Sequence, residues 1–341
     1  MAPRNLTQME VIDKVTAKSL RALRGLENAN VDGVIASYRT AAEQIEARLA
    51  LVMNDFPGGS WDLNTMSTTG RDQALFAEIN QILGGLIDQT NAEIGTGAVK
   101  QFDASINQTA YTLDQASPPN IKPRVPTIPA YQVQALINEP FEGAMFSQRI
   151  GIITDQMAGD IRGQLMQSMI NGEDMKKASA RVFKVIGTDT LADPKAYVNR
   201  ARTIARTEMM RAQNLGRAMT FEDNDELVEA LVWVATGDGR LCMNCLRRDG
   251  MTREQITDAP SSGDPWGNKA EPPLHPNCRC TYTPQMKTWK ELGIDIPDDA
   301  NDDWRVIKDP ETGKTGTVSV ETFDAWKVRR AAELRPEDIF V

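Results

Sequence analysis

The sequence predicts a mainly α protein with a small β element, that is, an α+β fold with a helical N-terminal arm and a helical core. Long stretches place apolar residues three, four or seven positions apart, which is the spacing of one helix face. One short run, residues 231–235, is instead rich in β-branched and aromatic side chains, as strands are. All four cysteines and the single histidine lie between residues 242 and 280. That clustering indicates a small unit held together by its side chains.

The N-terminal part of the chain should be helical. The pattern predicts helix over residues 5–54, with a break at Asn-Val-Asp-Gly (30–33), and the Phe-Pro-Gly-Gly run at 56–59 should end the second piece. A third helix is expected over 70–94, and the polar residues 97–116 fit either helix or extended chain. The apolar positions that define these faces are Val11, Val15, Ala22, Leu26, Ile45, Leu49, Val52, Leu75, Ile79, Ile82, Leu83 and Leu86.

A proline-rich segment follows. Residues 117–129 contain five prolines, which exclude helix and favour an extended, polyproline-like chain. We interpret the segment as a linker or a strap over a neighbouring element, and as the best domain boundary in the chain.

Three more helices and two strands are expected after the prolines. One helix follows from an apolar ladder and should be capped by Asn171-Gly172; shorter and longer helices are expected at 173–186 and 195–220. The strands are expected at 231–235 and 280–283, and Pro284 should end the second. The ladder consists of Ile150, Ile153, Met157, Ile161, Leu165 and Met169.

The polar side of the 195–220 helix is basic. It carries Lys195, Arg200, Arg202, Arg206, Arg211 and Arg217 against one acid, Glu208. One interpretation is contact with DNA or an acidic partner surface. We favour the other, an ordinary solvated face in which Arg206 and Glu208 belong to a local polar network.

Composition excludes several classes of function. A net charge of −9 disfavours a freely diffusing DNA-coating protein. A single histidine excludes a multi-histidine metal centre and histidine-rich catalysis. Apolar runs are too short for a membrane span, and the N-terminus has no secretory signal, so we expect a protein made on the cytosolic side and not bound to a membrane.

The cysteines are spaced like metal ligands. Cys242-Met-Asn-Cys245 is followed by His275-Pro-Asn-Cys278-Arg-Cys280. A Cys-x-x-Cys turn brings two sulfurs about 3.5–4 Å apart, as tetrahedral Zn–S bonds of about 2.3 Å require. The pattern predicts one structural Zn²⁺ per chain, which would stabilise a β-hairpin-like module that is too small to build a core alone.

Five candidates are one more than a structural zinc site needs. The favoured set is Cys242 and Cys245 with two of His275, Cys278 and Cys280. Cys278 and Cys280 project to the same side of an extended segment, so both could bind and leave His275 spare. Alternatively, His275 and one of these two cysteines bind.

Three readings compete with a metal. The cysteines could form two disulfides, which a reducing cytosol disfavours. They could be a redox pair, but no thioredoxin-like context surrounds the Cys-x-x-Cys motif. Cysteine and histidine could act as nucleophile and base, but no third orienting group is evident. We therefore predict no catalytic residues.

These motifs together resemble the phage Mu F-type head-morphogenesis family, the minor head (minor capsid) proteins. The resemblance is carried by the Ala201–Glu208 run (Ala-Arg-Thr-Ile-Ala-Arg-Thr-Glu), Trp233, the Cys-x-x-Cys turn, Asp249-Gly250 and Pro-Pro-Leu-His-Pro-Asn-Cys-Arg-Cys at 272–280. The helix at 145–170 also resembles the entry helix of that family. The histidine and cysteine run in register with the upstream turn is specific, whereas Ile-Ala-Arg-Thr-Glu alone is weak.

The resemblance implies a non-enzymatic virion protein of a tailed phage or prophage. It would sit at the portal vertex in several copies, bind the portal protein or the major capsid protein, and act in head assembly and in genome packaging or delivery. Packaged DNA is a further candidate partner, and the host cytoplasm is the expected site of assembly. The alternative is a zinc-ribbon nucleic-acid-binding protein or nuclease.

The resemblance also completes the predicted organisation of the chain. Trp289, Trp304, Phe323 and Trp326 flank an acidic stretch at 295–303, which suggests a tail that orders on a partner. The predicted regions are a helical N-terminal region 1–116, a proline-rich linker 117–140, the Mu F-like domain 141–285 with the cysteine and histidine cluster, and an acidic C-terminal tail 286–341.

Overall fold

The computed structural model confirms a mainly helical protein with a small antiparallel sheet. It describes residues 8–56, 61–117, 121–188, 193, 196–236, 241–259, 266–288, 291–292, 306–308, 315–317 and 322–333. The elements are α1 (Gln8–Asn54), α2 (Leu63–Thr68), α3 (Arg71–Ala116), α4 (Ala130–Ile137), α5 (Phe146–Ile170), α6 (Met175–Ile186), α7 (Tyr197–Glu222), β1 (Val228–Val234), α8 (Met243–Leu246), α9 (Arg253–Asp258), β2 (Thr281–Met286), β3 (Val306–Lys308), β4 (Thr315–Thr317) and α10 (Phe323–Glu333).

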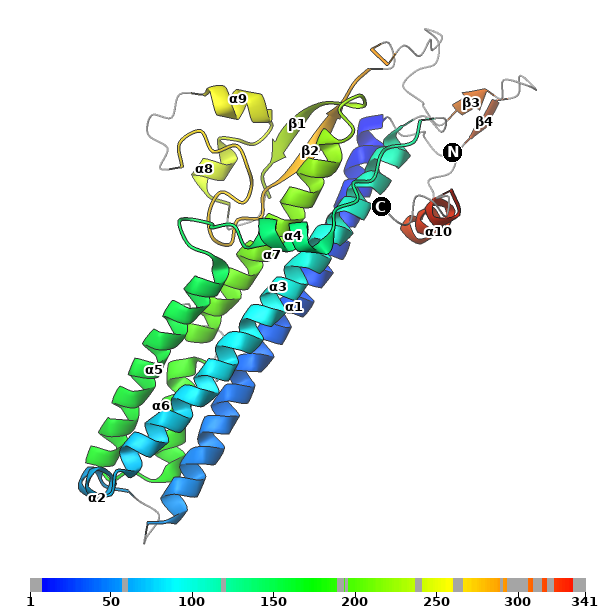
Figure 1. Ribbon diagram of the computed structural model, residues 1–341. Helices are drawn as coiled ribbons and strands as arrows, with labels where there is room; N and C mark the ends of the chain where they lie inside the picture. Colours follow the sequence, from blue (N-terminus) through cyan, green and yellow to red (C-terminus); the bar gives the residue numbers. More distant parts are fainter. Residues whose placement is uncertain are drawn as a thin grey trace, which may run out of the picture.

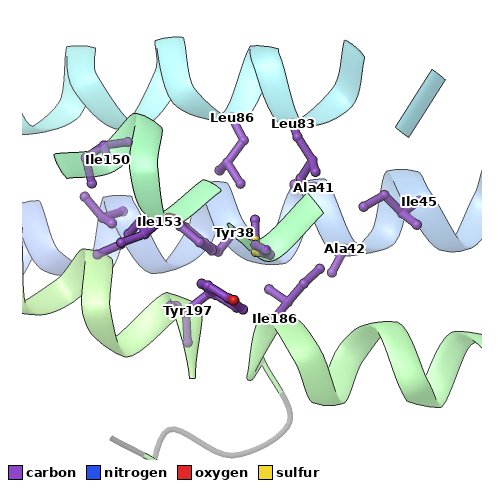
Figure 2. Close-up of a cluster of buried hydrophobic side chains, with 14 of the residues drawn as sticks. Tyr38, Ala41, Ala42, Ile45, Leu83, Leu86, Ile150, Ile153, Ile186 and Tyr197 are labelled. Atoms are coloured by element: carbon purple, nitrogen blue, oxygen red, sulfur yellow. The ribbon is translucent and has the colours of Figure 1, made fainter. Parts of the chain in front are cut away.

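A long helical bundle dominates the molecule (Figure 1). Helices α1 and α3 contain 47 and 46 residues, so each is about 70 Å long at 1.5 Å per residue. They pack along α5, α6 and α7 around one apolar core. Figure 2 shows side chains of this core, such as Tyr38, Leu83, Ile153 and Ile186, pointing toward one another from different helices. The core therefore joins the N-terminal helices to the middle of the chain.

Helix α5 matches its predicted apolar ladder. All six ladder residues are at most 5% exposed. The helix ends as expected, with Asn171 as its C-cap and Gly172 at a φ of +58°. A left-handed residue at that position lets the chain leave the helix without strain.

The predicted break at residues 30–33 is wrong, because α1 runs through it without interruption. Val31 and Val34 are buried there, and the Asn30 side chain donates to the Glu93 backbone carbonyl on α3 at 2.6 Å. A Cβ on Gly33 would lie 3.0 Å from the Glu93 carboxylate. These residues serve the close contact between α1 and α3, and tertiary packing overrides their local preference for a turn.

The polar residues 97–116 are helical and form the second half of α3. Ser105 and Thr112 donate to carbonyls of α3 itself, whereas Gln101 reaches the neighbouring helices. Gln101 is fully buried and donates from Nε2 to the Leu23 carbonyl of α1 at 3.1 Å and to Gln213 Oε1 of α7 at 3.0 Å. These hydrogen bonds replace apolar contacts at this end of the bundle.

Helix α7 lies close against α3 at Gly216. A Cβ there would lie 2.1 Å from Ser105 Oγ and 2.8 Å from the Phe102 carbonyl. The backbone oxygen cannot move aside as a flexible side chain can. We expect Gly216→Ala to force α7 away from α3 and to lower the free energy of unfolding by about 1–3 kcal/mol, measured by urea denaturation.

Gly163→Ala on α5 is the matched control. It also replaces a glycine inside a helix, but nothing lies within 4 Å of its Cβ position. Alanine should stabilise that helix by roughly 0.5–1 kcal/mol. Destabilisation of similar size in both variants would contradict close packing at Gly216.

The proline-rich segment runs as an extended strap against the end of α7. Residues 121–129 contain no helix or strand. The Arg124 backbone N–H donates to Asn224 Oδ1 at 2.6 Å, and Asn224 Nδ2 donates to the Arg124 carbonyl at 3.0 Å. Because Asn224 is fully buried, it satisfies both backbone groups of the strap away from water.

Strands β1 and β2 form an antiparallel pair. The expectation that Pro284 ends the second strand is wrong, because β2 continues to Met286 and pairs Pro284 with Leu231. In a two-stranded sheet both strands are edges, so a proline without an N–H can face away from its partner. Strands β3 and β4 form a second small antiparallel pair.

Helix α10 packs on the bundle. Trp326 is 2% exposed and lies in a cluster with Val15, Ala110 and Tyr111, and Arg329 donates to Asp114 at 2.7 Å. This part of the tail is thus ordered on its own chain. The acidic stretch at 295–303, Trp289 and Trp304 lie outside the described residues. Among the residues that the structure describes, no helix is both long enough and apolar enough to span a membrane.

Candidate metal centre

The β1–β2 pair brings the two halves of the cysteine pattern together. Trp233 pairs with Tyr282 and Val234 with Thr281. The chain leaves β1 toward Cys242, and Cys280 directly precedes β2, so both halves reach the same end of the hairpin. Side chains of this module form a separate apolar core, which also includes Leu113 of α3.

The first two cysteines form a tight turn at the start of α8. Cys242 is the N-cap of this helix, and its Sγ accepts a hydrogen bond from the Cys245 backbone N–H at 3.4 Å. The partial positive charge of this N–H stabilises a thiolate at Cys242. The sequence therefore places both sulfurs on one side of the turn, as a metal ligand pair requires.

The other four predicted ligands lie around Cys245. Its Sγ lies 3.3 Å from His275 Nε2 and 3.8 Å from Cys278 Sγ, and His275 Nε2 lies 3.3 Å from Cys242 Sγ. Zn–S bonds of about 2.3 Å in a tetrahedron separate two sulfurs by about 3.8 Å. The ligand atoms form two close groups that share Cys245: Cys242, Cys245 and His275, and Cys245, Cys278 and Cys280.

The second half of the pattern therefore supplies candidates to both groups. His275 is not remote from the pair in the first turn, and Cys278 and Cys280 both reach Cys245. Cys245 belongs to every set of four that the sequence left open. The ligand set itself stays a prediction.

The orientation of His275 suits a metal ligand. Its Nδ1 lies 2.9 Å from the Pro276 carbonyl, so a proton on Nδ1 would be hydrogen-bonded there and Nε2 would carry a lone pair. Nε2 is the atom that faces the sulfurs of Cys242 and Cys245. Burial lowers the pKa of His275, but the Pro276 carbonyl and the nearby thiolates outweigh burial, so the pKa lies above its ordinary value.

The buried sulfurs compete for protons. Cys245, Cys278 and Cys280 are each 2% exposed. Hydrogen bonds from the Cys245 and Cys280 thiols lower the pKa of Cys278, while the contact with Cys278 raises the pKa of Cys245. A divalent cation would favour the thiolate form of all the sulfurs that bind it. The donor types, burial and spacing therefore fit a structural metal ion.

The disulfide alternative has no support, because all four cysteines are free thiols. The 3.8 Å between the Cys245 and Cys278 sulfurs exceeds the S–S bond length of about 2.05 Å. The cluster can hold a metal ion.

Residues between the two halves are held by backbone contacts. The Asp249 carboxylate accepts from the Ala235 N–H at 2.8 Å, and Gly250 adopts a φ of +78°. Arg248 is 4% exposed and donates to the Asn244 and Gly267 carbonyls at 2.9 and 2.8 Å. These contacts fix the loop together with its own buried apolar side chains, Ile256, Ala270 and Leu274.

Helix α7 holds the segment that returns to β2 through polar contacts that sequence reasoning missed. Asn214 Nδ2 donates to the Cys280 carbonyl at 3.0 Å, and Arg217 donates to the Tyr282 carbonyl at 2.8 Å. Thr207 Oγ1 accepts from the Asn277 N–H at 3.1 Å. Lone polar residues on an apolar helix face could have suggested a buried polar contact, but not its partner.

Arg217 also corrects the predicted basic face of α7. It is 0% exposed, so it does not lie on the polar side of the helix. Burial lowers its pKa to about 10, still well above neutrality, so the buried guanidinium stays charged. The ring of Phe221 lies 5.4 Å from its Cζ.

The other bases near the middle of α7 are bound within the protein. Glu208 is 1% exposed and binds Arg149 of α5 and Arg211. Arg211 in turn donates to the Glu139 carbonyl just after α4 at 2.7 Å, and Arg206 lies 3.5 Å from Glu27 of α1. Arg206 and Glu208 are thus each paired locally, as expected, but with different partners. Because Glu208 is buried, the expectation of an ordinary solvated face is wrong at this position.

Comparison with known proteins agrees with the motifs. Residues 159–283 match the family described as Phage Mu protein F like protein. The match includes α6, α7, β1 and the whole cysteine and histidine cluster, and it confirms the resemblance predicted from the sequence. No curated protein and no solved structure gives a significant match.

Proposed function

We propose, from the premise that residues 159–283 resemble the Phage Mu protein F like family, that this chain is a structural minor head protein of a tailed phage or prophage. It associates with the portal vertex and acts in head assembly and in genome packaging or delivery. The match supports a phage Mu F-like head morphogenesis protein. This family match is the single observation that carries the proposal. Association with the portal vertex and a role in packaging go beyond the match and are part of what we propose.

The architecture supports a mechanical role. The matched residues include α7 and most of the hairpin module, that is, β1, the cysteine and histidine cluster and β2. Asn214, Arg217 and Thr207 of α7 fasten this module to the helix. Helix α7 also belongs to the core of the long bundle. A force applied to the module is therefore transmitted to the bundle through a helix and not through a loop.

We propose that the metal is one structural Zn²⁺ per chain, held by Cys242 and Cys245 with two of His275, Cys278 and Cys280. Thiolate and imidazole donors favour zinc over magnesium or calcium, which prefer oxygen ligands. A site closed by four protein ligands stabilises the module, which accords with a non-enzymatic role.

The proposed partners follow from the family. The chain would bind the portal protein or the major capsid protein in several copies around the portal, with packaged DNA as a further contact. It would be found in the virion, at the portal vertex, after assembly in the host cytoplasm.

Cross-linking of purified heads tests the proposal. We expect mass spectrometry to find this chain in heads purified from a strain that encodes it. Cross-links should join helices of this chain to the portal protein. Shells assembled from the major capsid protein without portal are the control and should hold little of the chain. Absence from purified heads would contradict the function, and equal retention by portal-free shells would contradict the vertex.

A further inference from the structure

The turn between His275 and Cys278 rests on one buried hydroxyl of α7. Thr207 is 0% exposed. Its Oγ1 donates to the Thr203 carbonyl at 2.8 Å and accepts from the Asn277 N–H at 3.1 Å. A hydroxyl can make both bonds at once, whereas an apolar side chain of the same shape can make neither.

The turn has a conformation that needs such support. Asn277 has a φ of +58°, in the left-handed region that asparagine tolerates better than most residues. The Cys278 N–H closes the turn on the His275 carbonyl at 3.0 Å. Asn277 adds a solvent-exposed bond from Nδ2 to Thr203 Oγ1 at 3.2 Å. The bond from the Asn277 backbone to Thr207 thus fixes the residue between two candidate ligands.

We propose that Thr207 is a positioning residue for the metal centre. Its hydroxyl holds Asn277 against α7, so that His275 and Cys278 both face Cys245. The inference rests on the metal centre proposed above. Groups that orient metal ligands typically contribute 10–100-fold to metal affinity, so the loss of this hydroxyl should weaken metal retention without abolishing the fold.

The chain offers a matched control on the same helix. Thr220 is also 0% exposed, and its Oγ1 donates to the carbonyl four residues earlier, that of Gly216, at 2.8 Å. Among the described residues, its hydroxyl has no hydrogen bond to residues 275–280. Thr207→Val and Thr220→Val therefore remove the same helix hydrogen bond and differ in the contact to Asn277.

The experiment measures the rate of Zn²⁺ release from the full chain to a chromogenic chelator. Far-UV circular dichroism first establishes a temperature at which each variant is folded. Thr207→Val should release Zn²⁺ about 10–100-fold faster than the wild type, and its Co²⁺ form should show an altered ligand-field spectrum. Thr207→Ser, which keeps the hydroxyl, should restore both properties, and Thr220→Val should change neither.

A second pair of variants tests the same turn from its exposed side. Asn277→Gly keeps the backbone N–H and accepts the positive φ, so it should retain Zn²⁺ nearly as well as the wild type. Asn277→Ala should release Zn²⁺ faster, because alanine is strained in this conformation. If Thr207→Val does not fold, the difference in Zn²⁺ release between these two variants tests the same turn.

The outcomes separate the two proposals. Release from Thr207→Val as slow as from Thr220→Val, with metal bound normally, would overturn the positioning role alone. If Thr207→Val does not fold, equal release from Asn277→Gly and Asn277→Ala would do the same. A wild-type chain that binds neither Zn²⁺ nor Co²⁺ would overturn the metal centre and this inference together.

Discussion

Replacing Cys245 by serine is expected to reduce the zinc content from about one ion per chain to nearly none. Cys245 is the ligand that both close groups share, and a serine hydroxyl is a poor substitute for a thiolate. Structural zinc sites contribute about 10–16 kcal/mol of binding free energy in small peptides, and this energy is also folding energy. We therefore expect the β1–β2 module to lose its folded structure and the thermal stability of the chain to fall.

The bundle should remain helical in the same variant, because its core is separate from the core of the module. Metal analysis of protein made under reducing conditions gives the zinc content. Hydrogen exchange should show lost protection in β1 and β2 but retained protection in α1 and α3. Normal zinc content in Cys245→Ser, or a fully protected module without metal, would contradict the prediction.

Cys278→Ser and Cys280→Ser assign the remaining ligands. Both sulfurs are close to Cys245, so burial alone does not separate them. A variant that loses zinc identifies a ligand, and a variant that keeps it identifies a spare thiol; loss in both variants would make His275 the spare residue. His275→Ala completes the comparison.

Glu208→Gln is expected to lower the free energy of unfolding strongly, because it changes a buried residue of the bundle. Glu208 is 1% exposed, and the arginines that it binds, Arg149 and Arg211, are each 18% exposed. Glutamine keeps the volume but leaves two nearby guanidinium groups without their shared anion. Removing one partner of a buried ionic network costs about 3–5 kcal/mol, and urea denaturation should show a loss of that order.

Glu222→Gln on the same helix is the control for that experiment. Glu222 binds Arg253, but its side chain is 52% exposed. Exposed ion pairs contribute about 0–1 kcal/mol, so this variant should unfold close to the wild-type midpoint. Similar losses in both variants would show that Glu208 does not organise a buried network.

Helices were predicted correctly where spacing and capping residues within the helix itself determine its extent. The ladder of α5 is visible because its six apolar residues repeat at helical spacing, and Asn171-Gly172 marks its end. The break at 30–33 is absent because Asn30 and Gly33 serve a contact with Glu93, sixty residues away or more. No local pattern contains that contact, so local reasoning assigned these residues to a turn.

The candidate site shows the same division. Residue type and spacing identified all four cysteines and His275 as ligand candidates, because a metal ion requires sulfur and nitrogen donors close together. The contacts of Thr207 and Asn214 with the returning segment could not be predicted, since a single buried threonine or asparagine has many possible partners. Arg217 was misplaced because a charged residue is usually exposed.

The length of α3 sets the reach of the molecule. Helix α2 lies just before the start of α3, and Leu113, near its other end, belongs to the core of the hairpin module. The continuous helix between them therefore keeps these two sites roughly 60 Å apart. Figure 1 shows α1, α5, α6 and α7 bracing it along the way. A partner bound near α2 would therefore be held at a fixed distance from a partner bound at the hairpin module.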